Sequence, residues 1–126
     1  MAITPLVPKN APPALAPYSV GVRVDNTIYV SGILPIGPDG NCVGQGDISA
    51  QTRYVLETVR GVLEAGGATL KNVAMNQIFL KDLNDYAAMN AVYKEFFPEN
   101  PPARYCIRAD LVKPEFLIEI ASTAHV

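Results

Sequence analysis

The sequence of 126 residues has no tryptophan, one histidine and two cysteines. A single histidine excludes the common multi-histidine metal sites and disfavours a histidine-based catalytic triad. This residue, His125, lies beside the C-terminus, where a solvated surface position is the simpler interpretation. Cys42 and Cys106 form no Cys-x-x-Cys pair, which disfavours a disulfide scaffold and a zinc module. A reducing, cytoplasmic location is therefore expected.

Charged residues are also scarce, at 17% of the chain with a net charge of −2. A typical soluble chain carries about 25% charged residues, so part of this surface is expected to be buried against other subunits. The absence of a basic run argues against nucleic acid as a partner. No apolar run of about 18 residues predicts a membrane span, and no charged segment followed by an apolar core predicts a secretory signal.

The length predicts one domain, covering residues 1–126. Residues 1–17 are rich in proline and are expected to form an extended arm, because proline fixes φ and donates no backbone hydrogen bond. Residues 19–24 and 27–34 read as strands joined at Asp25-Asn26, a hairpin signal. Glycines and prolines then predict a loop over 35–46.

Apolar residues at three- and four-residue steps predict a helix over 47–65. Asp47 suits its N-terminal end, and Gly66-Gly67 ends it. Residues 72–80 read as a central strand covered on both faces. A second helix is expected over 85–97, with Asn84 as its cap and Pro98 as its stop.

Two further strands are expected, at 102–108 and 116–121. The predicted order β-β-α-β-α-β-β gives the α+β class, a mixed sheet with two helices on one face. No helices remain for the other face. This again predicts an oligomer whose sheets pack together.

Arg104 and Glu119 on the last two strands carry the chemistry that we expect. An arginine holds a carboxylate with two parallel hydrogen bonds, which lysine cannot do. Glu119 lies among aliphatic neighbours, where desolvation raises the pKa of a carboxyl group and suits it to proton transfer with water. The alternative is an internal ion pair that only joins the strands. A simple hairpin sets the two residues side by side, whereas insertion of the last strand between earlier strands separates them.

Two more features lie on predicted strands. Cys106 shares a strand face with Arg104, and we interpret it as a small packing residue rather than a nucleophile, since no histidine base is nearby in sequence. Ser31-Gly32 interrupts an apolar strand. The missing side chain of Gly32 either lets a ligand approach the backbone or marks a bulge.

The sequence resembles the Rid family of reactive intermediate deaminases, also called the YjgF family. The resemblance covers nearly the whole chain, and its most specific part is Pro-Ala-Arg-x-Cys followed by Ile-Glu-Ile. The matching stretches are 16–19, 30–32, 51–58, 73–83, 89–93, 102–106 and 118–120.

The resemblance implies a chorismate-mutase-like fold and a homotrimer with three pockets at the subunit clefts. It implies hydrolysis of enamines or imines derived from amino acids to a carbonyl acid and ammonia, without metal or cofactor. By the same resemblance Arg104 holds the substrate carboxylate and Glu119 positions the attacking water. The pocket-lining positions it implies are Tyr18, Ser31, Gly32, Asn90 and Cys106.

The substrate stays open at this point. Residues 51–60, 95–98, 111–114 and 124–125 look most like the branch that deaminates 3-aminoacrylate, whereas 16–19 and 81–85 look more like the branch acting on 2-aminoacrylate and 2-iminobutanoate. Two other classes are considered: a trimer that senses a keto acid or similar metabolite, and an endoribonuclease or translation inhibitor. A sensor needs the arginine but not the glutamate, and the acidic balance disfavours RNA.

Overall fold

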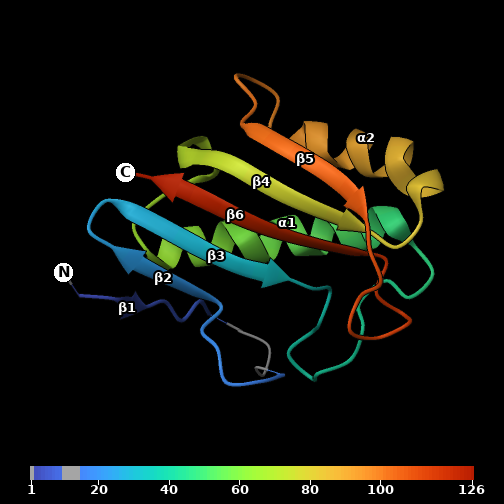
Figure 1. Ribbon diagram of the computed structural model, residues 1–126, viewed down its shortest axis with the longest axis horizontal. Helices are drawn as coiled ribbons and strands as arrows, with labels where there is room; N and C mark the ends of the chain where they lie inside the picture. The colour runs from blue at the N-terminus through green and yellow to red at the C-terminus, as the bar shows by residue number, and fades with distance from the viewer. Residues whose placement is uncertain (1, 10–14) are drawn as a thin grey trace.

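The computed structural model describes residues 2–9 and 15–126. In it a six-stranded mixed sheet carries two helices (Figure 1), which confirms the predicted α+β class. The strand order is β1-β2-β3-β6-β4-β5. The strands are β1 Thr4–Pro5, β2 Gly21–Val24, β3 Thr27–Ile33, β4 Val73–Leu80, β5 Ala103–Arg108 and β6 Ile118–His125.

The N-terminal half of the sheet agrees with the prediction except at its edge. β2 and β3 form the expected hairpin, and Asp25 in its turn has a φ of 51°. Part of the predicted arm forms β1, a two-residue strand that pairs with β2. Local signals do not predict this strand, because a proline occupies one of its two positions. Positions 1 and 10–14 of the arm lie outside the described residues.

The first helix follows its predicted signals and the second does not. Helix α1, Ile48–Ala65, begins where the Asp47 carboxylate accepts a hydrogen bond from the Ala50 amide, and Gly67 beyond its end has a φ of 84°. Helix α2 is Tyr86–Phe96, and the predicted cap at Asn84 is wrong. Asp82 accepts from the Asn84 amide instead, at 2.9 Å, and starts a 3₁₀ turn over Leu83–Asp85 that runs directly into α2.

The last strand lies inside the sheet. β6 pairs antiparallel with both β3 and β4, while β4 and β5 run parallel. The hairpin alternative for the last two strands is therefore wrong, and the insertion alternative is right. The physical reason is burial: the central position places Ile118 and Ile120 in the hydrophobic core, where both are fully buried.

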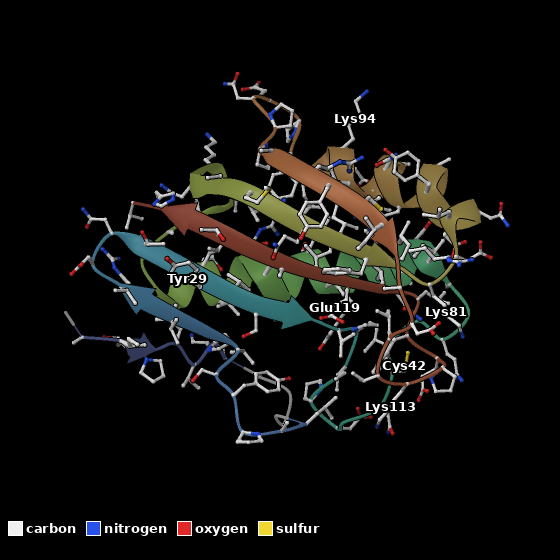
Figure 2. The ribbon with its side chains drawn as sticks, in the orientation of Figure 1. Tyr29, Cys42, Lys81, Lys94, Lys113 and Glu119 are labelled. Carbon is white, nitrogen blue, oxygen red and sulfur yellow. The ribbon has the colours of Figure 1, made fainter. Side chains whose placement is uncertain are left out.

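Both helices pack on one face of the sheet and enclose the core with it (Figure 1). The opposite face has no helix over it within residues 2–9 and 15–126. Large side chains stand exposed there: Tyr29 is 50% exposed, Tyr105 41% and Ile107 48%. Figure 2 shows Tyr29 on this face. We call it the open face.

Candidate active site

Arg104 is held by residues of α2. Its Nη2 donates to Asn90 Oδ1 at 2.7 Å and to the Tyr86 hydroxyl at 3.1 Å. Its Cζ lies 4.7 Å from the centre of the Tyr93 ring and 5.7 Å from that of Tyr86. Hydrogen bonds and cation–π contacts together fix the guanidinium, so Arg104 presents its charge from a rigid mount.

A buried polar chain supports this mount from the core. Asn76 on β4 is fully buried, and its amide donates to the Tyr93 hydroxyl at 2.9 Å. Ser122 on β6 donates to Asn76 Oδ1 at 2.6 Å. Buried polar groups are costly unless they are paired, and here each has a partner. These hydrogen bonds therefore fix the Tyr93 ring, which the guanidinium of Arg104 contacts.

Arg104 and Cys106 open into one cleft, which they line together with Leu83, Tyr86 and Tyr105. Burial raises the pKa of the Cys106 thiol, and Arg104 lowers it by less. The thiol is therefore protonated at neutral pH, which fits a lining residue better than a nucleophile. Arg104 is the only charged group among the five lining residues, so the cleft suits a small anion.

Glu119 belongs to a second group of predicted residues. Its carboxylate lies against the backbone of Gly32, where a Cβ on Gly32 would come within 2.9 Å of Glu119 Cδ. Gly32 and Tyr18 line a small cavity together, and Ser31 donates to the carbonyl of Ser19 at 2.6 Å. The bulge predicted at Gly32 is confirmed, because the pairing of β3 with β6 shifts register between Val30 and Ile33, while approach of a ligand to its backbone stays a prediction.

The Glu119 carboxyl accepts no hydrogen bond from the residues that the structure describes. Burial alone raises the pKa of this carboxyl. A half-buried carboxyl with a raised pKa and no partner is free to accept a proton from water. The internal ion pair with Arg104 is absent from the described part of the chain.

Arg104 and Glu119 lie on opposite faces of the sheet. Arg104 pairs with Asn76, whose side chain reaches Tyr93 on the helix face. Glu119 pairs with Phe79, three residues further along β4 and therefore on the open face. The structure thus separates the predicted site within one chain into Arg104, with Asn90 and Cys106, and Glu119, which lies against Gly32. Tyr18 and Ser31 lie near Gly32 rather than near Arg104.

Over residues 2–9 and 15–126, no group of three or more His, Cys, Asp or Glu side chains is placed to hold a metal ion. No helix in this part of the chain is long and apolar enough to cross a membrane.

Comparison with known families decides where the chain belongs. Residues 8–126 match the family described as endoribonuclease L-PSP. The chain belongs to this family. It is also known as the YjgF or Rid family, so the family resemblance read from the sequence is confirmed.

Relatives within the Rid family match along the whole chain. The 3-aminoacrylate deaminase RutC of Acinetobacter baylyi is 54% identical over 121 residues, which cover 96% of each chain. The crystal structure of yeast Mmf1 is 34% identical, covers 98% of each chain and has a TM-score of 0.91. The crystal structure of E. coli TdcF with bound serine is 30% identical, covers 98% of each chain and has a TM-score of 0.89.

Sequence patterns did not single out the residues that support Arg104 in this Rid protein. Tyr86 and Tyr93 fall within the helix predicted over 85–97, and Asn76 falls within the strand predicted over 72–80. The signal was present in the spacing: Tyr86, Asn90 and Tyr93 are four and three residues apart and so share one face of a helix. What the spacing did not indicate is that this face meets Arg104.

Proposed function

We propose that this Rid protein is a deaminase that hydrolyses small enamine or imine acids to a carbonyl acid and ammonia. The observation that carries the proposal is the fixed guanidinium of Arg104 in an otherwise uncharged cleft. Such a group selects a small molecule with one carboxylate. The named activity of the Acinetobacter relative, a 3-aminoacrylate deaminase, supports the same class of substrate.

The proposed reaction needs a carboxylate anchor and one group that moves protons. An enamine first takes a proton from solvent on carbon and becomes an iminium ion. Glu119 accepts a proton from water as the water oxygen bonds to the iminium carbon, which gives a neutral carbinolamine. The protonated Glu119 returns its proton to the nitrogen, the carbon–nitrogen bond breaks to release ammonia, and the hydroxyl proton passes to solvent as the carbonyl forms. The raised pKa of Glu119 suits both directions of transfer.

We propose further that each complete site is shared between two subunits of a homotrimer in a chorismate-mutase-like arrangement, with residues 1–126 as one domain. Within a chain, Arg104 and Glu119 face away from each other across the sheet. A partner that covers the open face would bring its own Arg104 cleft beside Glu119. The exposed aromatic residues of the open face and the low charge content support such an interface.

Ammonia release from enzymatically generated 2-aminoacrylate and 3-aminoacrylate, measured side by side, tests the activity. Faster release from one of them than in the buffer control supports a deaminase and identifies its preferred substrate. Ammonia release from both compounds at the rate of the buffer control rejects the deaminase proposal. Light scattering at micromolar concentration tests the assembly, and a monomer mass would contradict the trimer and the shared site together.

Mixing two inactive variants tests the shared site more directly. Arg104→Lys and Glu119→Gln are unfolded, mixed in equal amounts and refolded. If each site takes its arginine from one subunit and its glutamate from the next, about a quarter of the sites in random trimers are intact. Activity should therefore reappear in the mixture. A mixture as inactive as the separate variants would show that one chain supplies both residues.

The alternatives give different results in the same assays. A sensor binds a small carboxylate acid but releases no ammonia from either aminoacrylate. The description of the family as an endoribonuclease raises RNA cleavage as a second alternative. The net charge of −2 disfavours it, because RNA binding relies on basic surface. RNA cleavage that persists in Arg104→Lys and Glu119→Gln would point to a site elsewhere on the chain or to a contaminant.

A further inference from the structure

The hydrogen bonds of Arg104 leave an incomplete fork for a ligand. Nη2 has two hydrogens, and these point to Asn90 and Tyr86. Nε and Nη1 donate no hydrogen bond within residues 2–9 and 15–126. A two-pronged grip on a carboxylate uses Nη2 together with one of these nitrogens. With Nη2 occupied by the protein, Arg104 alone offers the carboxylate only single hydrogen bonds.

The Tyr86 hydroxyl offers a second hydrogen-bond donor beside Arg104. Its oxygen accepts from Arg104 Nη2, and its own hydrogen is donated to none of the residues that the structure describes. The side chain is 44% exposed and lines the same cleft as Arg104 and Cys106. A phenol is protonated at neutral pH and is a good donor to an anion. An unused donor therefore lies 3.1 Å from the guanidinium, at the mouth of its cleft.

We propose that Tyr86 is a second binding residue for the substrate carboxylate. One carboxylate oxygen accepts from Arg104 Nη1, and the other accepts from the Tyr86 hydroxyl, which continues to accept from Nη2. The two side chains act as one clamp with a cationic arm and a neutral arm. This inference rests on the proposed function only in requiring a small carboxylate as the ligand.

The direction in which carboxylate affinity changes when the Tyr86 hydroxyl is removed shows whether Tyr86 binds the ligand or competes with it. If Tyr86 merely occupies the place of a carboxylate oxygen, a ligand must displace it, and removal of the hydroxyl strengthens binding. If Tyr86 donates to the ligand, removal of the hydroxyl weakens binding. Tyr86→Phe keeps the ring over Arg104 and removes only the hydroxyl, so it tests the sign without emptying the site.

Binding of propanoate, a stable three-carbon carboxylate, is measured by NMR titration of the full chain, with propanamide as the uncharged comparison. The matched control is Tyr54→Phe. Tyr54 lies on α1 and is not among the residues that line the cleft. Arg104→Lys is measured alongside. Thermal unfolding of each variant shows whether it is folded, and Tyr86→Phe is expected to be folded because Tyr86 lies at the surface and keeps its ring in the variant.

We expect Tyr86→Phe to raise the Kd for propanoate about 10-fold, the scale of a hydrogen bond to a charged group, and Tyr54→Phe to leave the Kd unchanged. An unchanged or lower Kd in Tyr86→Phe overturns the inference, and if Arg104→Lys still weakens binding the proposed function stands. Equal weakening by Tyr86→Phe and Tyr54→Phe also overturns the inference. Failure of the wild-type protein to prefer propanoate over propanamide overturns both this inference and the carboxylate role of Arg104.

Discussion

The carboxylate of Glu119 on β6 occupies the space that a side chain on Gly32 of β3 would need. A Cβ built on Gly32 lies 2.9 Å from Glu119 Cδ and closer still to its Oε2. We therefore expect Gly32→Ala to displace the carboxylate, to lower the free energy of unfolding by about 1–3 kcal/mol and to abolish most turnover. Urea unfolding and the ammonia assay measure the two effects.

Two controls keep the Gly32 prediction specific. In a Glu119→Ala background the added methyl group of Gly32→Ala meets no carboxylate, so its cost should largely vanish. Gly61 lies in α1, where a Cβ would contact only Pro8 at 3.8 Å, and Gly61→Ala should stabilise the protein by up to about 1 kcal/mol. An equal cost in both backgrounds would show that Gly32 is needed for the bulge alone.

Glu119→Gln separates water activation from binding. The amide keeps the size of the side chain but cannot accept a proton, so turnover should fall roughly 100-fold or more. Binding of a small carboxylate inhibitor through Arg104 should persist. Calorimetry and the turnover assay on one preparation measure both. Normal turnover would mean that the water is activated elsewhere, and loss of binding would mean that Glu119 only builds the pocket.

The raised pKa of Glu119 also predicts how stability changes with pH. A carboxyl whose pKa is raised on folding contributes stability below its unfolded pKa of about 4.3 and loses it as the pH rises through the folded value. Relative to wild type, Glu119→Gln should therefore become more stable as the pH rises through this window. Denaturant unfolding at a series of pH values measures the difference.

Glu95→Gln is the matched control, for which the pH dependence of stability should have the opposite sign. The hydrogen bond from Arg53 holds the pKa of Glu95 below its ordinary value, so its contribution is lost as the pH falls. The effect should be small because the pair is exposed. A flat difference between wild type and Glu119→Gln across this window would show that burial does not raise the Glu119 pKa in solution.

Arg104→Lys should lose most activity, because a point charge does not reproduce the planar guanidinium and its bonds to Asn90 and Tyr86. Breaking a buried charge pair with the substrate can cost about 2–5 kcal/mol of transition-state stabilisation. The ratio kcat/KM measures this loss. Arg108→Lys, at the exposed end of the same strand, should keep normal activity. Near wild-type activity in Arg104→Lys would make Arg104 a structural residue.

Tyr93→Phe tests the buried polar chain beneath Arg104. The change leaves the Asn76 amide without its acceptor in the core, which should cost about 1–3 kcal/mol of the free energy of unfolding. The phenyl ring stays under the guanidinium of Arg104, so the folded variant should still bind a carboxylate. Tyr105→Phe, which removes an exposed hydroxyl partner of Gln77, should change stability by less than about 0.5 kcal/mol. Equal losses of stability in Tyr93→Phe and Tyr105→Phe would show that the buried hydrogen bonds of Asn76, Tyr93 and Ser122 do not support the site.

The sequence alone predicted the elements that depend on local signals. The helix over 47–65 follows from apolar spacing with an aspartate at one end and glycines at the other, and the hairpin follows from Asp25-Asn26. Local signals failed at Asn84, because Asp82 caps a 3₁₀ turn over Leu83–Asp85 that places Asn84 inside a turn rather than at the start of a helix. They also failed at β1, whose existence depends on pairing with β2 rather than on its own composition.

The site shows the same division. Sequence chemistry selected Arg104 and Glu119, because a charge on an otherwise apolar strand requires a partner or a use. Only the tertiary structure decided that β6 enters between β3 and β4, and therefore that the two residues occupy opposite faces of the sheet. Strand order depends on which long-range contacts bury the most apolar surface, and no local spacing encodes it. The same contacts bring Tyr86, Asn90 and Tyr93 from α2 to Arg104 on β5.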